Sequence, residues 1–252
     1  MRFARRLAFV SAAVVVLAAC GERMIFEAST DPTIESSATD AIEPAANDQG
    51  GDTGGNTTKE TQPGTISWET CTPGSTGTFE CGYLDVPFDY NDPSVGTFSL
   101  YLVRRIADTA SSRIGSMLVN PGGPGFGGSD VAAYAEWYVS DALMARFDIV
   151  GWDPRGTGKS TPAVDCIDDY DRYFAIDSPP NDAAAKQEMI DLTQEFVDKC
   201  IERNAEMLKY ISTENSARDM DSIRRALGEE QITYFGFSYG SELGATWVTM
   251  FP

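Results

Sequence analysis

One serine in this sequence stands in a pattern that suits nucleophilic attack. Ser238 lies in Gly-Phe-Ser-Tyr-Gly (236–240), between an apolar run that predicts a strand and a run that predicts a helix. Glycines on both sides permit a turn tight enough to hold the hydroxyl clear of the backbone. The helix that follows points the positive end of its dipole at developing negative charge. The pattern predicts a catalytic serine, and a tight turn that merely contains a serine is the alternative.

Two other glycine-rich motifs could bind phosphate, but each lacks a needed feature. The segment 156–161 resembles a phosphate-binding loop, yet Asp153 stands where that motif needs a glycine, and its carboxylate would repel phosphate. The segment 123–128 has the glycine spacing of a dinucleotide site, yet Pro124 removes one of the N–H groups such a loop would offer. We therefore expect no cofactor.

The elements that must position Ser238 indicate an α/β sheet. We expect strands at 82–87, Thr97–Arg105, Gly115–Asn120, Phe147–Trp152 and 232–237, and helices at 129–147, 216–228 and 241–251, with a mostly helical acidic stretch at 165–212. Ser129 or Asp130 would cap the first of these helices. A capping-box pattern at 216–219 would open the second, and Gly228 would end it. Antiparallel strands followed by β–α alternation are typical of the α/β class.

Four motifs in order resemble a known family. They are VNPGGPGFGGSD (119–130), FDIVGWDPRGTGKSTP (147–162), ARDMDSIRRALG (217–228) and YFGFSYGSELGATW (234–247). Together they resemble the α/β-hydrolases of the proline iminopeptidase and tripeptidyl aminopeptidase type, in particular the secreted bacterial branch. CGYLDVPFDY (81–90) is similar to the first strand of that branch, so the resemblance runs from about residue 68 to 252.

The resemblance implies a site and a reaction. Ser238 would attack a substrate carbonyl, and the backbone N–H groups of Tyr239 and of the Gly122–Gly123 pair, with Gly123 preferred, would bind the oxyanion. Asp153 and Arg155 would hold a structural turn beside the site. The implied function is serine hydrolysis, with residues cleaved from the amino terminus of a peptide or a small acyl substrate turned over. The alternatives are an esterase or lipase of the same fold, and a catalytically inactive, lipid-tethered binding protein.

The reaction needs partners that this sequence lacks. A serine hydroxyl requires an adjacent base, and the 252 residues contain no histidine. In α/β-hydrolases the acid and the histidine follow the nucleophile along the chain. The resemblance therefore implies that both come after residue 252 and that 66–252 is the amino-terminal part of the hydrolase domain. We expect a sheet incomplete at its carboxyl-terminal side, an exposed apolar sheet edge, and no triad hydrolysis by this chain alone.

The first residues predict export and lipid anchoring. Three arginines at 2–6 precede an apolar run at 7–17, which is typical of a signal peptide over 1–19. Leu-Ala-Ala-Cys (17–20) resembles a bacterial lipoprotein signal, so we expect an acylated Cys20 that anchors the protein to the cell envelope membrane. A signal peptide with a chance cysteine is the alternative. Residues 20–65 are rich in Gly, Thr and acids, and predict a disordered tether.

Charge and cysteine content agree with an exported protein. The net charge of −19 excludes a nucleic-acid partner in our interpretation, because phosphates would be repelled. Besides Cys20 the chain has four cysteines, which suits two disulfides outside the cytosol. Three pairings are possible, and we favour Cys71–Cys81 and Cys166–Cys200, with buried free thiols as the alternative. A zinc site is disfavoured, because no histidine and no Cys-x-x-Cys pair is present.

Overall fold

A computed structural model describes residues 64–74, 76–175 and 179–252. The signal peptide and Cys20, with the tether as far as residue 63, lie outside the described residues. The predicted hydrolase domain lies inside them, apart from 75 and 176–178.

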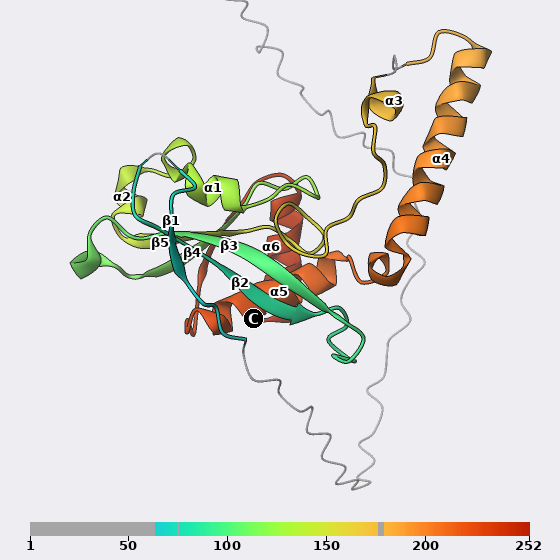
Figure 1. The fold of residues 1–252 in the computed structure, drawn as a ribbon. Helices are drawn as coiled ribbons and strands as arrows, with labels where there is room; N and C mark the ends of the chain where they lie inside the picture. Colours follow the sequence, from blue (N-terminus) through green and yellow to red (C-terminus); the bar gives the residue numbers. More distant parts are fainter. Residues whose placement is uncertain (1–63, 75, 176–178) are drawn as a thin grey trace, which may run out of the picture. The chain divides into compact units, whose positions relative to one another are not determined.

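Six strands form one mixed sheet (Figure 1). They are β1 Glu69–Cys71, β2 Phe79–Pro87, β3 Thr97–Arg105, β4 Gly115–Asn120, β5 Phe147–Trp152 and β6 Thr233–Gly236, in the order β1-β2-β3-β5-β4-β6. Strand β1 pairs antiparallel with β2, β2 with β3, and β3 with β5, whereas β4 pairs parallel with both β5 and β6. The carboxyl ends of the parallel strands β4, β5 and β6 therefore lie on the same side of the sheet, and the segments that follow these strands gather there.

Most of the strand predictions are confirmed. The bounds of β3, β4 and β5 are those expected, and β6 is one residue shorter at each end. Strand β2 begins earlier than predicted, because its pairing with β3 extends to Phe79 opposite Arg105. The three-residue β1 was not expected.

The helices are α1 Ser129–Ala133, α2 Asp141–Met144, α3 Asp171–Phe174, α4 Ala183–Leu208, α5 Thr213–Ala226 and α6 Tyr239–Met250, with 3-10 turns η1 at Ala110–Ser112 and η2 at Ala135–Trp137. Among the described residues, none of these helices is both long and apolar enough to cross a membrane.

The single helix predicted at 129–147 is wrong. The backbone leaves the helical conformation at Tyr134 (φ −119°, ψ 41°) and is extended at Ser140. The segment between them is rich in aromatic and β-branched residues, which have low helix propensity. Neither Ser129 nor Asp130 caps the segment, because Gly128 occupies the N-cap position of α1.

The predicted start of α5 is also wrong. The helix begins at Thr213, and the Ser212 hydroxyl caps it by accepting a hydrogen bond from the Asn215 N–H at 3.2 Å. The capping-box pattern at 216–219 lies inside the helix, where the carboxylate of Asp219 bonds Arg155 instead. The predicted end is confirmed, because Gly228 follows the helix in the left-handed conformation with φ 72°.

Apolar side chains cover both faces of the sheet. Helices α5 and α6 lie on one face and α1 and α2 on the other (Figure 1). The first face buries residues that include Leu118, Val150, Met220, Ile223 and Leu243. The second buries residues that include Met117, Val119, Val131, Ala132 and Ile149. Neighbouring residues of β4 thus point to opposite faces, as they do in any strand covered on both sides.

Two disulfides join the pairs favoured from the sequence. Cys71 of β1 is bonded to Cys81 of β2, which ties the edge strand to its neighbour. Cys166 is bonded to Cys200 of α4. This second disulfide belongs to a small cluster with Ile167 and Tyr173, which attaches α4 to the segment that follows β5.

Candidate active site

Ser238 occupies the turn between β6 and α6. Its backbone has φ 51° and ψ −124°, and among the described residues no other non-glycine residue has a positive φ. Such a conformation costs of the order of 1–3 kcal/mol and persists only where the surroundings enforce it. The residue is exposed, and its hydroxyl makes no hydrogen bond within the described part of the chain. The turn presents a hydroxyl that is free to react.

The side chain of Tyr234 leaves no room for a Cβ atom at two glycines near this turn. A Cβ atom added at Gly236 would lie 2.6 Å from the Tyr234 hydroxyl oxygen, and one at Gly244 would lie 2.5 Å from ring atom Cε1. The Tyr234 hydroxyl donates to the Gly240 carbonyl at 2.8 Å, and burial raises its pKa, which keeps this donor protonated. These contacts seat β6 against the first two turns of α6 and thereby fix Ser238.

This packing reverses the usual effect of a glycine-to-alanine change in a helix. Alanine normally stabilises a helix interior by roughly 0.5–1 kcal/mol relative to glycine. For Gly244→Ala we expect a loss of about 1–3 kcal/mol in the free energy of unfolding, because the methyl group overpacks against Tyr234. Urea denaturation measures this, with Ala245→Ser at the exposed neighbouring position as control. A stabilised Gly244→Ala would show that the ring does not hold α6.

The glycine loop after β4 lies directly against the turn. A Cβ atom at Gly122 (φ 94°) would lie 2.5 Å from the Phe237 carbonyl oxygen and 3.0 Å from the Tyr239 nitrogen. Asn120, which is 1% exposed, joins the two segments. Its side-chain oxygen accepts from the Gly122 N–H at 2.8 Å, and its backbone carbonyl accepts from the Phe237 N–H at 3.0 Å. The sequence analysis missed Asn120, whose one signal was a polar residue at the end of an apolar strand.

The backbone N–H groups of the two predicted oxyanion donors have no acceptor among the described residues, whereas that of Gly122 has one. The Gly122 N–H is already bonded to Asn120. The N–H groups of Gly123 and Tyr239 donate to no other described residue. The first N–H groups of a helix have no partner within the helix, which explains why Tyr239, the first residue of α6, is free to donate. Both groups are therefore available to a developing oxyanion.

A cleft of about 570 Å³ opens beside these groups. Its walls are the glycine loop after β4, the loop after β5, the first residues of α5 and the first turns of α6; the lining residues include Gly122, Gly156, Ile211, Ser216, Tyr239 and Leu243. The Tyr239 hydroxyl and the Thr213 hydroxyl share a hydrogen bond of 2.9 Å, which links the residue after Ser238 to the start of α5.

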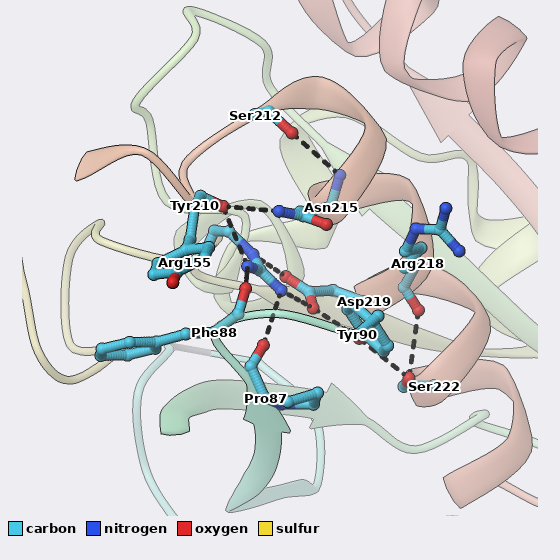
Figure 2. Close-up of polar contacts among 10 residues, drawn as sticks. All are labelled: Pro87, Phe88, Tyr90, Arg155, Tyr210, Ser212, Asn215, Arg218, Asp219 and Ser222. Carbon is cyan, nitrogen blue, oxygen red and sulfur yellow. Dashed lines mark hydrogen bonds and ion pairs between the residues drawn. The ribbon is translucent and has the colours of Figure 1, made fainter. Parts of the chain in front are cut away.

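A buried ion pair holds two of the cleft walls together (Figure 2). Arg155, in the loop after β5, and Asp219, on α5, are both fully buried and form two hydrogen bonds of 2.8 and 2.6 Å. The remaining guanidinium donors reach the carbonyl oxygens of Pro87, Phe88 and Tyr210. The arginine thereby fixes the loop, the end of β2 and the start of α5 relative to one another.

The protonation of this network follows from its burial and its pairing. Burial tends to lower the pKa of Arg155, but the hydrogen bond and the charge of Asp219 outweigh it, so that the pKa is raised. Burial raises the pKa of Asp219, while its bonds from Arg155 and Tyr90 oppose the rise. We assign the carboxylate as ionised, because the guanidinium faces it in two-point geometry. Burial, and then the charge of Asp219, raise the pKa of Tyr90, which stays a donor.

Asp153 holds the same loop separately from Arg155. Its carboxylate accepts hydrogen bonds from the backbone N–H groups of Ser129 at 3.2 Å and Lys159 at 2.9 Å. Its backbone carbonyl accepts from the Ser160 hydroxyl at 2.5 Å. The side chain is buried and lines no part of the cleft. These bonds agree with the structural role expected for Asp153 and Arg155.

Comparisons with known proteins agree with this arrangement. The sequence profile of the alpha/beta hydrolase fold matches residues 115–252. The tripeptidyl aminopeptidase of Streptomyces coelicolor is 40% identical over 197 residues, which cover 74% of this chain and 36% of that protein. The serine protease Hip1 of Mycobacterium tuberculosis is 37% identical over 175 residues (68% and 33%), and its carboxylesterase B is 40% identical over 172 residues (64% and 32%).

The chain spans about a third of the length of these relatives. The residues that match the profile include the glycine loop, the buried ion pair and the turn at Ser238, and they make up more than half of the chain. This chain belongs to the α/β-hydrolase fold family, and its relatives include two proteins that are named for peptide cleavage.

Proposed function

We propose that this chain supplies the nucleophile and the oxyanion site of a serine hydrolase that removes residues from the amino terminus of peptides. The observation that carries the proposal is the strained, exposed Ser238, whose hydroxyl is unbonded within the described residues. The unbonded N–H of Tyr239, the next residue, and that of Gly123 in the loop packed against the turn support it.

In the proposed reaction the Ser238 Oγ attacks the substrate carbonyl carbon while a base takes the hydroxyl proton. The carbonyl oxygen becomes an oxyanion that accepts hydrogen bonds from the N–H groups of Gly123 and Tyr239. Collapse of this intermediate expels the amine with a proton, and water then releases the acyl group from Ser238. Because the chain has no histidine, we assign the base and its acid partner to polypeptide outside these 252 residues. This chain alone should therefore show no triad hydrolysis.

Peptide and ester substrates can be separated in the active enzyme, by which we mean this chain joined to its acid and histidine. Two of the relatives are named for peptide cleavage and one for ester cleavage. The assay compares kcat/KM for a tripeptide p-nitroanilide with a free amino group, the same peptide acetylated, and p-nitrophenyl acetate. We expect a preference for the free amino group. Equal turnover of the acetylated peptide, or turnover of the ester alone, would contradict an aminopeptidase and favour the esterase alternative.

We further propose that the protein is exported and anchored by an acylated Cys20. The Leu-Ala-Ala-Cys pattern at 17–20 supports anchoring, and the two disulfides agree with export. We expect intact-mass measurement of the membrane fraction to show a chain that begins at Cys20 with an acyl increment, and Cys20→Ser to lack that increment. A soluble wild-type product that begins at another residue would refute the anchor.

A further inference from the structure

The wall of the cleft formed by α5 contains a hydroxyl that the fold leaves unused. Ser216 is 7% exposed and lines the cleft. Its hydroxyl bonds to no residue in the part of the chain that the structure describes. The neighbouring hydroxyls are engaged, because Ser212 caps the helix and Thr213 bonds Tyr239. The Ser216 Oγ is not among the fully buried side-chain atoms that lack a partner in the described residues, so it is open to the cleft. A hydroxyl that is open to the cleft and bonds no described residue is available to a ligand.

The rest of the cleft restricts the kind of ligand group. Among the residues that the structure describes, Arg155 is the only charged one that lines it, and Asp219 and three backbone carbonyls accept hydrogen bonds from its guanidinium. An ionised group would find no free counter-charge there and would lose its hydration. Val164, Ile211 and Leu243 give apolar walls. The cleft suits an uncharged group that is largely apolar and carries a hydrogen-bonding atom, for which the hydroxyls of Ser216 and Thr157 bond no other described residue.

The position of the cleft relates it to the reaction. Gly122 and Tyr239 line the cleft as well as the turn at Ser238. A substrate whose carbonyl lies at Ser238 can therefore extend an adjoining side chain toward α5. We propose that this cleft is a substrate subsite for an uncharged polar side chain, such as that of threonine, and that the Ser216 hydroxyl determines its specificity. This inference rests on the proposed function.

Threonine and valine differ by a hydroxyl in place of a methyl group and are nearly equal in size, so they isolate the contact with Ser216. The active enzyme is assayed with pairs of tripeptide substrates that differ only in having threonine or valine at one position next to the scissile bond. Each such position is tested in turn. At the position that enters the cleft we expect kcat/KM to favour threonine by about tenfold, the upper range for a neutral hydrogen bond. In Ser216→Ala this ratio should fall toward one.

Ser222→Ala is the matched control. Ser222 is on the same helix and is similarly buried, at 9% exposed, but its hydroxyl has partners, the Arg218 carbonyl and the Tyr90 hydroxyl, and it does not line the cleft. This variant should keep the threonine preference of the wild type. Loss of the preference in both variants would assign the effect to α5 as a whole and overturn the role of Ser216.

A binding measurement on the 252-residue chain separates this inference from the proposed function. N-acetyl-threonine amide and N-acetyl-valine amide are titrated while the backbone amide signals of Ser216 and Tyr239 are followed by NMR. We expect the threonine amide to bind more tightly, by about the same factor, and the preference to vanish in Ser216→Ala. Equal affinities, a preference that survives in Ser216→Ala, or no binding of either probe would overturn the subsite. Binding with this preference but no hydrolysis of any substrate by the active enzyme would refute only the proposed function.

Discussion

Ser238→Ala in the active enzyme should lower kcat by on the order of 10⁶-fold, as removal of the nucleophile does in a serine hydrolase. The change removes the one atom that forms the acyl bond, while the N–H groups of Gly123 and Tyr239 remain. Residual activity of about 10³–10⁴ over the uncatalysed reaction should persist, because binding and oxyanion stabilisation survive. Steady-state kinetics with the preferred tripeptide substrate measures the change.

Ser241→Ala is the control for this variant. Ser241 is exposed on the first turn of α6, and its hydroxyl makes only a 3.5 Å contact with the Gly236 carbonyl. Its replacement should leave kcat within about twofold of the wild type, since surface substitutions away from special features usually have small effects. If Ser238→Ala and Ser241→Ala have similar activities, Ser238 is not the nucleophile.

Asp219→Ala should lower the free energy of unfolding by about 3–5 kcal/mol, the usual cost of removing one partner from a buried ion pair. Asp219 and Arg155 are both fully buried, so the variant leaves the guanidinium in the interior without its counter-charge. The Tyr90 hydroxyl would lose an acceptor as well. Urea denaturation of the 252-residue chain measures the loss.

An exposed ion pair provides the contrast. Asp168 bonds Arg203 at 2.9 Å, but the Asp168 side chain is 87% exposed. Asp168→Ala should therefore leave the free energy of unfolding nearly unchanged, because solvent screens exposed ion pairs. The double variant Arg155→Met/Asp219→Leu should be more stable than Asp219→Ala, because no charge remains buried. A cost for Asp219→Ala no larger than that for Asp168→Ala would show that the pair does not hold the loop against α5.

The sequence predicted the parts of this fold that local pattern determines. Strands β3, β4 and β5 are apolar runs bounded by turn residues, and their bounds were predicted correctly. The three residues of β1 are too few for a periodic signal, and their place in the sheet depends on pairing with β2. The predicted 129–147 helix breaks at Tyr134, because the aromatic and β-branched residues that follow have low helix propensity.

In the site, too, the sequence predicted what local pattern determines and not what depends on tertiary contacts. The glycine motif located Ser238, Tyr239 and the loop at Gly123 without any tertiary information, and their catalytic roles stay predictions. Asn120 and Ser216 could not be found in this way. Asn120 acts through a contact with Phe237, and Ser216 is set apart by its place in the wall of the cleft, with a hydroxyl that bonds no described residue. Both facts depend on residues that are distant in sequence.

The structure has an exposed apolar sheet edge, as the sequence predicted. Strand β6 is at the end of the sheet, and Phe235 and Phe237 are 39% and 36% exposed there, with their rings 4.6 Å apart. Val248 of α6 is 57% exposed. Exposed apolar groups on an edge strand favour association with other chains.

The most direct test of the central claim is the site of covalent labelling by a fluorophosphonate. The active enzyme is treated with the reagent, digested, and analysed by mass spectrometry. If the strained turn between β6 and α6 presents the nucleophile, the phosphonyl group will be found on Ser238, and Ser238→Ala will not be labelled. Undiminished labelling of Ser238→Ala, or a modified residue elsewhere in the wild type, would contradict the assignment.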